Sequence, residues 1–180
     1  MTLDISPRDI RPQRGCQVSR VDPLAAAQYR EIYLRAVKEY ERLRGRGSKT
    51  NFMLKDHLWV PLFIETGRVA DMAMLRNRRD ALPCGVGEAH LTILADGTVL
   101  PCRRLPLPIG QVPQQSIRDI WLNSKRLNQL RDRKRYRKCA ACAYADHCMG
   151  CPAVAFGQAG DPFAADPQCW VEVRETDTKR

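Results

Sequence analysis

Residues 139–151 read CAACAYADHCMGC, which places four cysteines within thirteen positions. Two residues separate Cys139 from Cys142, and two separate Cys148 from Cys151. A turn of this length presents both sulfurs to one metal site. The segment is rich in small residues and has little hydrophobic periodicity, so burial alone cannot hold it together. It therefore predicts a cysteine-rich fold built around metal.

Three more cysteines lie on either side of this segment. Twelve residues separate Cys84 from Gly97, and four more lead to Cys102, while Cys169 follows Cys151 after seventeen intervening residues. The pair Asp96-Gly97 is a strong hairpin signal between residues 90–94 and 98–102. A hairpin here brings two of these thiols near each other. Seven cysteines in this arrangement indicate metal binding.

The surroundings of the thiols bear on their chemistry. No stretch approaches the roughly 20 consecutive apolar residues that span a bilayer, and the first residues lack a secretory signal. We therefore expect a cytoplasmic protein without a membrane segment, in which clustered cysteines are metal ligands rather than disulfides. The eighth cysteine, Cys16, stands far from the others and is expected to be an incidental thiol.

Spacing alone leaves the identity of the metal open. Four thiolates suit zinc as well as an iron–sulfur cluster. Seven ligands make one complete four-cysteine site and one incomplete site. An incomplete site is easier to reconcile with iron–sulfur chemistry, because an open iron can take a substrate, a water or a carboxylate.

The rest of the chain predicts an α+β fold. A helix is expected to start with Asp22 as its cap and Pro23 at its first position, and to end at Gly45 and Gly47. Its apolar stripe consists of Leu24, Ala27, Ile32, Leu34, Val37, Tyr40 and Leu43. A short helix is expected within residues 52–67, with Asp56 as its cap, Gly67 as its end and Pro61 distorting it. Another is expected within residues 69–80.

Beyond the hairpin, residues 109–112 lie among prolines and are expected to form a loop. Ser116 and Asp119 make a capping box that opens a helix, and Ser124 opens a second helical stretch. From Cys139 onward we expect loops that wrap around metal. The predicted organisation is an irregular lead-in (1–21), a helical segment (22–79), a cysteine-rich domain (80–172) and a polar tail (173–180).

The chain carries a formal net charge of +10, and residues 131–138 form a dense basic run. Such an excess can serve nucleic acid or an acidic partner, and it can also offset the negative charge of clusters and thiolates. We favour a solvated helix end that leads into the cysteine segment. The nearly uncharged residues between Cys142 and Cys148 are atypical of zinc modules that bind nucleic acid.

Other candidate residues carry weaker signals. His57, His90 and His147 contain no pair at metal-ligand spacing, and only His147 adjoins a predicted ligand. We expect His57 to pack within its apolar segment. Arg103 and Arg104 directly follow Cys102, where they are either cluster-side cations or part of an exposed turn. Trp121 occupies a helical core position and is expected to pack rather than to relay electrons.

The whole cysteine pattern resembles the SPASM domain, the C-terminal extension of radical S-adenosylmethionine enzymes that mature peptides and proteins. The stretches HLTILADGTVLPCRRLP (90–106) and IGQVPQQSIRDIWLNS (109–124) resemble the hairpin and the following helix of the family. The resemblance covers roughly residues 80–170. Residues 22–67 are similar, less distinctively, to the end of the preceding barrel and the linker.

The resemblance implies two auxiliary [4Fe–4S] clusters and a set of ligands for each. It assigns Cys139, Cys142, Cys148 and Cys169 to one cluster, and Cys84, Cys102 and Cys151 to the other. The fourth ligand of the second cluster is open among Asp80, an exchangeable ligand and Cys16. One departure concerns Cys151, because the family usually has three residues before this cysteine where Met149 and Gly150 give two.

The resemblance further implies electron transfer or substrate placement in radical-dependent modification of a peptide or protein. The loop that binds the catalytic cluster, Cys-x3-Cys-x2-Cys, is absent from these 180 residues, so we expect no S-adenosylmethionine site and no catalysis by this chain alone. The chain is then expected to be the C-terminal part of a radical enzyme or a separate subunit whose partner chain supplies the radical core, with an inactive fragment as a further possibility. Nucleic acid is not expected as a partner. The alternative is a zinc-binding interaction module that contacts nucleic acid.

Overall fold

The computed structural model describes residues 24–50, 57–68, 84–145 and 147–173. In chain order its elements are α1 (Ala26–Gly45), α2 (Trp59–Glu65), β1 (Thr92–Ile93), β2 (Thr98–Leu100), β3 (Gly110–Gln111), α4 (Ile117–Asn123), α5 (Lys125–Arg131), the 3₁₀ helix η1 (Arg133–Arg135), α6 (Arg137–Ala140) and α7 (Pro152–Ala159). Helices precede and follow a small antiparallel sheet, which confirms the expected α+β class. Among the described helices, none has the length and apolar character needed to cross a membrane.

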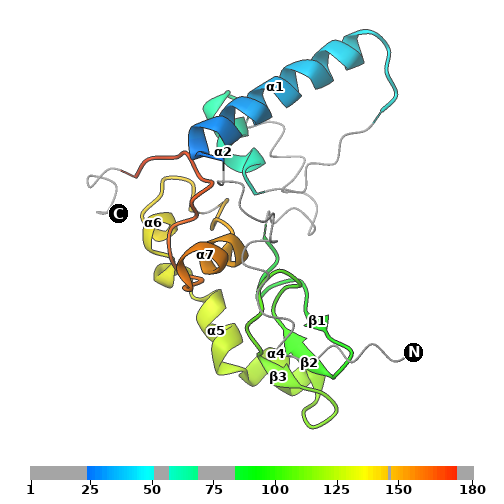
Figure 1. The fold of residues 1–180 in the computed structure, drawn as a ribbon, viewed down its shortest axis with the longest axis vertical. Coiled ribbons are helices and arrows are strands. Elements are labelled where there is room, and N and C mark those ends of the chain that lie inside the picture. Colours follow the sequence, from blue (N-terminus) through cyan, green and yellow to red (C-terminus); the bar gives the residue numbers. More distant parts are fainter. Residues whose placement is uncertain (1–23, 51–56, 69–83, 146, 174–180) are drawn as a thin grey trace.

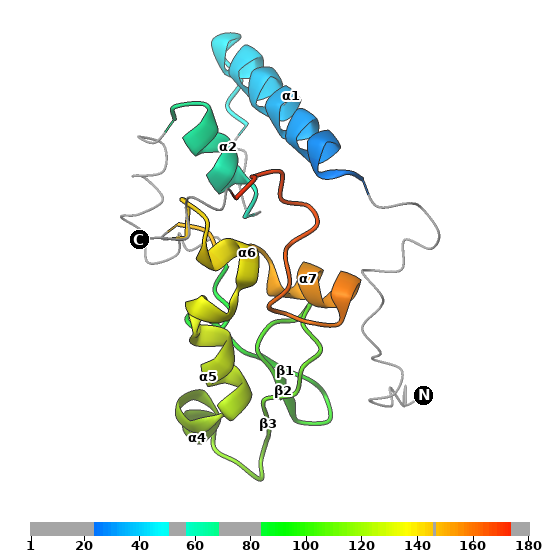
Figure 2. The ribbon, with the colours of Figure 1, turned by 90° about the vertical axis from the view of Figure 1, so that its left-hand side faces the viewer.

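The molecule has three regions along its long axis (Figures 1 and 2). Helices α1 and α2 lie at one end, and the sheet with α4 lies at the other. Helices α6 and α7 lie between them, so the cysteine segment occupies the middle of the molecule. The chain after α7 runs back from this middle region toward α1 and α2 (Figure 2).

Helix α1 begins three residues later than the sequence predicts. Ala25 is its N-cap, and the backbone N–H of Ala25 donates to the side-chain oxygen of Gln28. Asp22 and Pro23, the expected start, lie outside the described residues. No residue of α1 is buried, and Ile32 in its apolar stripe is 47% exposed. Helix α1 therefore covers α2 with one side and leaves apolar surface uncovered on this chain.

Helix α2 is short and largely buried. It begins after Leu58, which replaces the predicted cap Asp56, a residue outside the described ranges. Pro61 lies in the first turn of α2, where the backbone N–H groups have no partner within the helix. Phe63 and Val60 form an apolar cluster with Trp59, Ile64 and the side chain of Cys148. This contact joins α2 to the cysteine segment. The helix predicted within residues 69–80 lies outside the described part of the chain.

The hairpin forms as predicted, and a third strand joins it. Strand β1 pairs with β2 in an antiparallel register that places Ile93 opposite Val99. Strand β3 pairs with the other edge of β2, with Gly110 opposite Val99. The sequence analysis predicted a loop for β3, so this part of the prediction was wrong. Two residues between prolines carry too little pattern to reveal a strand that exists only through its pairing with β2.

Helices α4 and α5 cover this sheet. The Ser116 hydroxyl accepts from the backbone N–H of Asp119 at 3.0 Å, which confirms the predicted cap. The Ser124 hydroxyl donates to the carbonyl of Ile109 at 2.8 Å, so the second helix is tied to the strand region through its N-cap. A core forms from Val99, Ile109, Ile120 and Leu127.

The cysteine segment contains more helix than predicted. Cys139 lies within α6, and Cys151 is the N-cap of α7 with Pro152 at the first helical position. A second apolar cluster beneath α7 contains Val86, Leu105 and Leu130, with Phe156 packed against it. The expectation of loops alone was therefore wrong. Short helices of this kind form through tertiary packing, which local periodicity does not reveal.

Candidate metal centre

The seven predicted ligands come from four parts of the fold. Cys84 opens the sheet region, Cys102 follows β2, and Cys169 lies in the segment after α7. The remaining four lie in α6, in the turn after it and at the start of α7. All seven are free thiols in the structure. Cys16 and Asp80, the other candidate ligands, lie outside the described residues.

Four of the thiols interact electrostatically with one another. Burial raises the pKa of Cys139 to about 12, and the charges of Cys169, Asp166 and Cys142 add to this effect. Burial also raises the pKa of Cys148 to about 12, with contributions from Cys139, Cys169 and Cys142. We call this set the four-thiol group; its members are Cys139, Cys142, Cys148 and Cys169.

The other three thiols form a second set. Burial raises the pKa of Cys84 to about 11, and the neighbouring thiols that contribute to the rise are Cys151 and Cys102. Cys84 and Cys102 both pack against the apolar cluster beneath α7. We call Cys84, Cys102 and Cys151 the three-thiol group. These influences connect thiols within each of the two sets.

Backbone N–H groups point at most of these sulfurs in a repeated local geometry. The N–H two residues after the cysteine donates to the sulfur at Cys102 (from Arg104, 3.5 Å), at Cys142 (from Tyr144, 3.5 Å) and at Cys148 (from Gly150, 3.4 Å). The same offset recurs where Val86 and Val171 donate to Cys84 and Cys169, whereas Cys151 accepts from Val154 and, more weakly, from Ala153. These dipoles favour a thiolate, which is the form that binds metal. The sequence analysis did not foresee this pattern, which depends on backbone turns.

The thiols and their donors fit a metal cluster. A ligating cysteine must lose its proton, and the raised pKa values mean that a metal has to displace protons from these buried groups. Among the described residues, no three His, Cys, Asp or Glu side chains are grouped to hold a single metal ion. A zinc ion takes all its thiolates on one atom, whereas a four-iron cluster takes one thiolate on each iron.

A cationic side chain lies beside the three-thiol group. The guanidinium of Arg104 donates to the sulfur of Cys151 at 3.9 Å, and its backbone N–H donates to Cys102. Arg104 is exposed, as is its neighbour Arg103. The sequence left two interpretations open, a cation beside the cluster and a part of an exposed turn. Arg104 fits both, because it lies in an exposed turn and contacts a candidate ligand.

The structure also reveals a buried pair that sequence reasoning missed. His57 Nε2 lies 2.6 Å from Asp166 Oδ2, and each residue is only 3% exposed. The same carboxylate accepts from the backbone N–H groups of Cys151 and Gln168, both at 2.9 Å. Burial would raise the pKa of Asp166, but the hydrogen bond and charge of His57, with the two N–H groups, lower it. His57 is buried as expected, yet it pairs with a charge next to the cysteines.

The basic run makes contacts within the chain. Arg133 donates to the carbonyl of Ala145, Arg137 pairs with Asp161 at 2.9 Å, and Lys138 donates to the carbonyl of Cys169 at 3.0 Å. The guanidinium of Arg135 lies 4.7 Å from the ring centroid of Phe163. These contacts fasten the segment after α7 and the turn after α6 to the helix end. They agree with the favoured prediction of a helix end that leads into the cysteine segment.

The remaining candidate residues are Trp121, His90 and His147. Trp121 packs against the core of the sheet region, as predicted, and the guanidinium of Arg131 lies 4.7 Å from its ring centroid. His90 is exposed, and His147 is partly buried in the turn before Cys148. A part for His147 beside the metal stays a prediction.

Comparisons with known proteins match the region around the first four of these cysteines. Residues 84–143 match the family model of SPASM, an iron–sulfur cluster-binding domain. An AdoMet-dependent heme synthase of Methanosarcina barkeri is 34% identical over 87 residues, which cover 48% of this chain and 25% of that protein. The AdoMet-dependent heme synthase of Nitratidesulfovibrio vulgaris is 36% identical over 87 residues, 48% of this chain and 24% of the relative.

A PqqA peptide cyclase of Ruegeria pomeroyi is 36% identical over 91 residues, 47% of this chain and 24% of that protein. The matched segments thus span about a quarter of the length of these curated relatives. No solved structure matches the chain. The matched region and the cysteine spacing agree, and residues 84–143 of this chain are therefore similar to the SPASM iron–sulfur cluster-binding domain.

Proposed function

We propose that this chain holds two auxiliary [4Fe–4S] clusters and serves electron transfer in the radical-dependent modification of a peptide or protein. The four-thiol group would bind one cluster, and the three-thiol group would bind the other. The observation that carries the proposal is which thiols act on one another: the charges of Cys151 and Cys102 act on Cys84, whereas those of Cys142 and Cys169 act on Cys139 and Cys148. When bound, such clusters supply one-electron redox chemistry; this chain supplies the ligands, the N–H donors and the buried charges around them.

The crossing of Cys151 from its sequence neighbours to the other set supports this proposal. Cys148 and Cys151 are separated by Met149 and Gly150, one residue fewer than is usual in the family. Gly150 adopts a positive φ of 69°, and a Cβ placed on it would lie 3.1 Å from the sulfur of Cys139. The tight turn at Gly150 directs Cys151 into the start of α7 and toward Cys84, so the shorter spacing is compatible with the crossing.

Electron transfer is favoured because the two sets are close neighbours. The segment 148–151 contributes one thiol to each set, and the backbone of Cys151 contacts Asp166, whose charge also acts on Cys139 and Cys169. Clusters held by these ligands would be separated by one short turn of chain. Such proximity suits passage of an electron from one cluster to the next.

Substrate placement is the second candidate role, and the arginines after Cys102 favour it. Arg104 contacts Cys151, which belongs to the set with three identified ligands, and Arg103 and Arg104 are both exposed. A carboxylate on a peptide could pair with these cations next to the open position of that cluster. This role predicts that arginine substitutions change the affinity for peptide rather than the cluster content.

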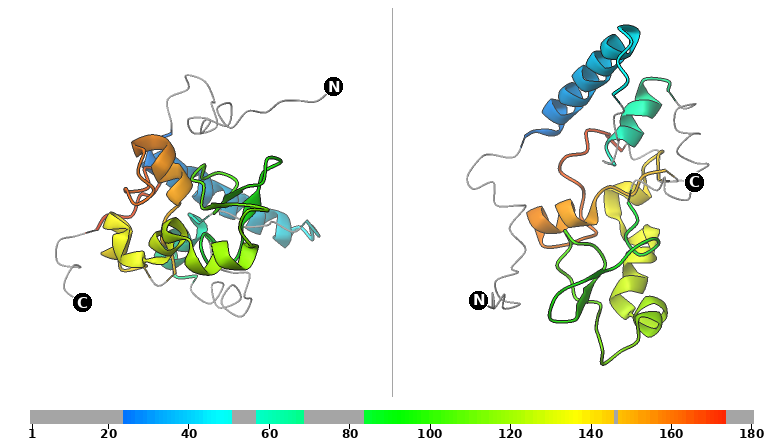
Figure 3. Two further views of the ribbon diagram at one scale, coloured as in Figure 1. Left: turned by 90° about the horizontal axis from the view of Figure 1, so that it is seen from below. Right: turned by 90° about the vertical axis from the view of Figure 1, so that its right-hand side faces the viewer.

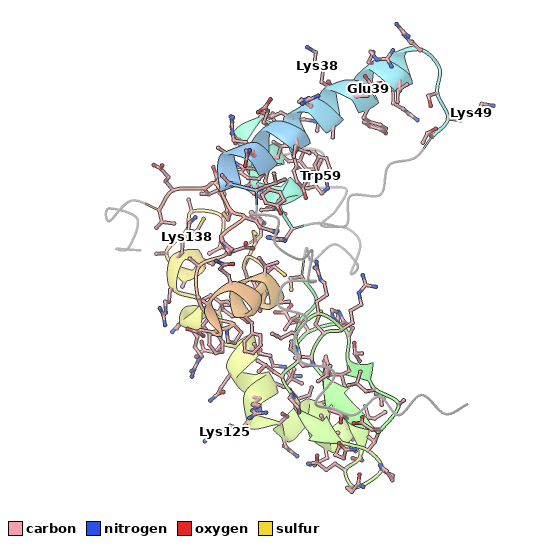
Figure 4. All side chains as sticks on the ribbon, viewed as in Figure 1. Lys38, Glu39, Lys49, Trp59, Lys125 and Lys138 are labelled. Carbon is pink, nitrogen blue, oxygen red and sulfur yellow. The ribbon has the colours of Figure 1, made fainter. Side chains whose placement is uncertain are left out.

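The relatives' names support a peptide substrate and use of S-adenosylmethionine only as proposals for this chain. One relative is a PqqA peptide cyclase, and two are AdoMet-dependent heme synthases. The radical core would lie in another part of the same protein or in a partner chain. The uncovered face of α1, where Ile32 is exposed and Lys38 points away from the rest of the molecule, is the surface that such a core would cover (Figure 4). We place the protein in the cytoplasm, where the thiols stay reduced.

The zinc module that contacts nucleic acid is less well supported. Much of the basic run is occupied by contacts with Ala145, Asp161, Phe163 and Cys169, rather than forming one open cationic face. The domain match also describes an iron–sulfur cluster-binding domain. Metal analysis separates the two readings directly.

The test is anaerobic reconstitution of the full chain, followed by iron, sulfide and zinc analysis and by EPR of the reduced protein. We expect about eight irons with matching sulfide and a [4Fe–4S] signal. The Cys16→Ala variant tests the thiol that is left open as the fourth ligand: loss of one cluster would assign Cys16 to it, and loading of both clusters would exclude Cys16. Stoichiometric zinc that iron does not replace, with no sulfide, would refute the proposal.

A further inference from the structure

The carboxylate of Asp166 lies at the junction of the two thiol groups. One of its oxygens is bound to His57 and to the backbone N–H of Cys151, a member of the three-thiol group. A Cβ placed on Gly150 would lie 3.1 Å from the sulfur of Cys139 and 3.4 Å from the Cβ of Asp166. Asp166 therefore adjoins the four-thiol group on the other side. Its side chain is 1% exposed.

The negative charge of Asp166 acts on thiols of both groups. It contributes to the raised pKa of Cys139 and Cys169 in one group and of Cys151 in the other. Because the carboxylate is buried, solvent and salt screen its charge only weakly.

We propose that the buried Asp166 carboxylate, held in position by His57, tunes the reduction potentials of both clusters. This inference rests on the proposed function, since it requires that the thiol groups hold redox-active clusters. Reduction adds one negative charge to a cluster. A fixed anion nearby in a low-dielectric site disfavours that added electron, so Asp166 keeps both potentials lower than they would be beside a neutral side chain.

His57 acts through Asp166 and is a positioning residue. Its ring comes from the residues before α2, 109 positions away in sequence, and binds the same carboxylate oxygen as the backbone N–H of Cys151. The carbonyl of His57 also accepts from the thiol of Cys148 at 4.0 Å. The pair thereby makes the region around α2 part of the cluster environment, although this region lies outside the matched domain.

The test is a redox titration of the reconstituted full chain, followed by EPR, in the wild type and in Asp166→Asn. The amide keeps an oxygen for the backbone N–H groups and removes the charge. The matched control is Asp161→Asn: Asp161 also accepts from the N–H two residues later, but its other partner is the surface residue Arg137. We expect an upward shift of both potentials in Asp166→Asn and no shift in the control.

Each outcome decides a separate question. A wild type that loads no iron–sulfur cluster would refute the proposed function, and the tuning role with it. If Asp166→Asn retains iron and sulfide but its potentials equal those of the wild type, the tuning role alone is refuted. A variant that folds by circular dichroism and loads neither cluster would show that Asp166 builds the site, which also refutes tuning. If Asp166→Asn retains only one cluster, the reduction potential of that cluster, compared with the wild type, decides whether Asp166 tunes it.

The positioning role of His57 has its own readout. In His57→Phe the carboxylate loses its ring donor, so we expect both potentials to change. His57→Gln restores a side-chain N–H, and we expect it to bring the potentials back toward those of the wild type. Equal potentials in the wild type and in the two variants would refute positioning by His57.

Discussion

At the scale of single residues, Gly150 determines how closely the two thiol groups approach each other. It combines a left-handed backbone, φ 69°, with a site where any Cβ would meet the sulfur of Cys139 at 3.1 Å. Gly160, at the end of α7, has nearly the same φ of 70° but no atom within 4 Å of such a Cβ. A comparison of substitutions at the two glycines therefore separates the effect of backbone strain from the effect of crowding at the thiols.

We predict that Gly150→Ala impairs loading of the four-thiol group, whereas Gly160→Ala affects stability alone. Each substitution places a side chain in the left-handed region at a cost of about 1–2 kcal/mol. Only the change at Gly150 also pushes against Cys139. Iron analysis and urea unfolding of both variants provide the measurements, and equal iron loss in the two would contradict the account.

Tyr136 is a second residue whose contribution to stability can be measured, through its hydroxyl. It is buried and donates to the carbonyl of Leu130 at 2.8 Å, while its ring packs edge-on against Phe163. Burial strongly raises the pKa of Tyr136, so the hydroxyl stays protonated at neutral pH. We predict that Tyr136→Phe destabilises the folded chain by about 1 kcal/mol without changing iron content. Urea unfolding measures the stability, and iron analysis measures the cluster content. A fall in iron content would contradict the prediction.

Sequence reasoning at this scale identified the cysteines but not their surroundings. The ligands are visible because their spacings recur in metal sites. The pair of His57 and Asp166 is not visible in the sequence, because neither residue belongs to a motif with a characteristic spacing. Their association exists only once the segment after α7 folds back toward α2, as Figure 3 shows.

At the scale of elements, one carboxylate ties three of them together. Glu65, at the end of α2, accepts from Arg30 of α1 and from the indole N–H of Trp170 in the segment after α7. The Arg30 hydrogen bond lowers the pKa of Glu65 most; burial opposes it, and the bond from Trp170 assists it. Tyr33 of α1 packs edge-on against Trp59, which lies below α1 in Figure 4.

We predict that Glu65→Gln weakens the attachment of α1 by less than about 1 kcal/mol at neutral pH, because the ion pair is partly exposed to solvent. The folded state lowers the pKa of Glu65, so its stabilisation is fully present above the ordinary pKa near 4.5 and is lost as the pH falls through the folded-state value. Tryptophan fluorescence during urea unfolding at pH 7 and pH 3 measures this.

The matched control for this prediction is Glu39→Gln. Glu39 pairs with Arg42 within α1, so its loss leaves the contacts between elements intact. The difference in unfolding free energy between the wild type and Glu65→Gln should shrink at low pH. A difference that persists at pH 3, or that equals the one in Glu39→Gln, would contradict the proposed link.

Elements were predictable where local chemistry defines them. The Asp-Gly turn and the Ser116 cap each act over a few residues, and both features formed as expected. Strand β3 and helices α6 and α7 depend on neighbours distant in sequence, so neither turn residues nor periodicity indicated them. The start of α1 moved because Ala25 with Gln28, rather than Asp22, provides the first described cap.

At the scale of the whole molecule, the cysteine segment connects the two ends of the molecule. Helices α1 and α2 lie on one side of it and the sheet region on the other (Figures 1 and 3). The apolar clusters are small and separate, and the two that adjoin the cysteine segment have cysteine side chains packed against them. The order of the middle region therefore depends on what the thiols bind.

We predict that removal of iron by a chelator exposes residues 137–173 to proteolysis before the sheet region. The apolar core around Val99 and Ile120 contains no cysteine, whereas α6 and α7 carry ligands directly. Limited digestion with mass spectrometry of loaded and chelated protein reports the order of cleavage. Equal protection of residues 137–173 in both forms would contradict the role of metal in holding this region.

The central claim, two clusters with Cys151 crossing to the set of Cys84 and Cys102, is tested most directly by EPR of three reconstituted variants. We predict that Cys151→Ala loses the same cluster signal as Cys102→Ala and retains the signal that disappears in Cys148→Ala. This follows from the two thiol groups, although Cys148 and Cys151 are neighbours in sequence. If Cys151→Ala and Cys148→Ala lost the same signal, while Cys102→Ala kept it, the division of the ligands proposed for this chain would be wrong.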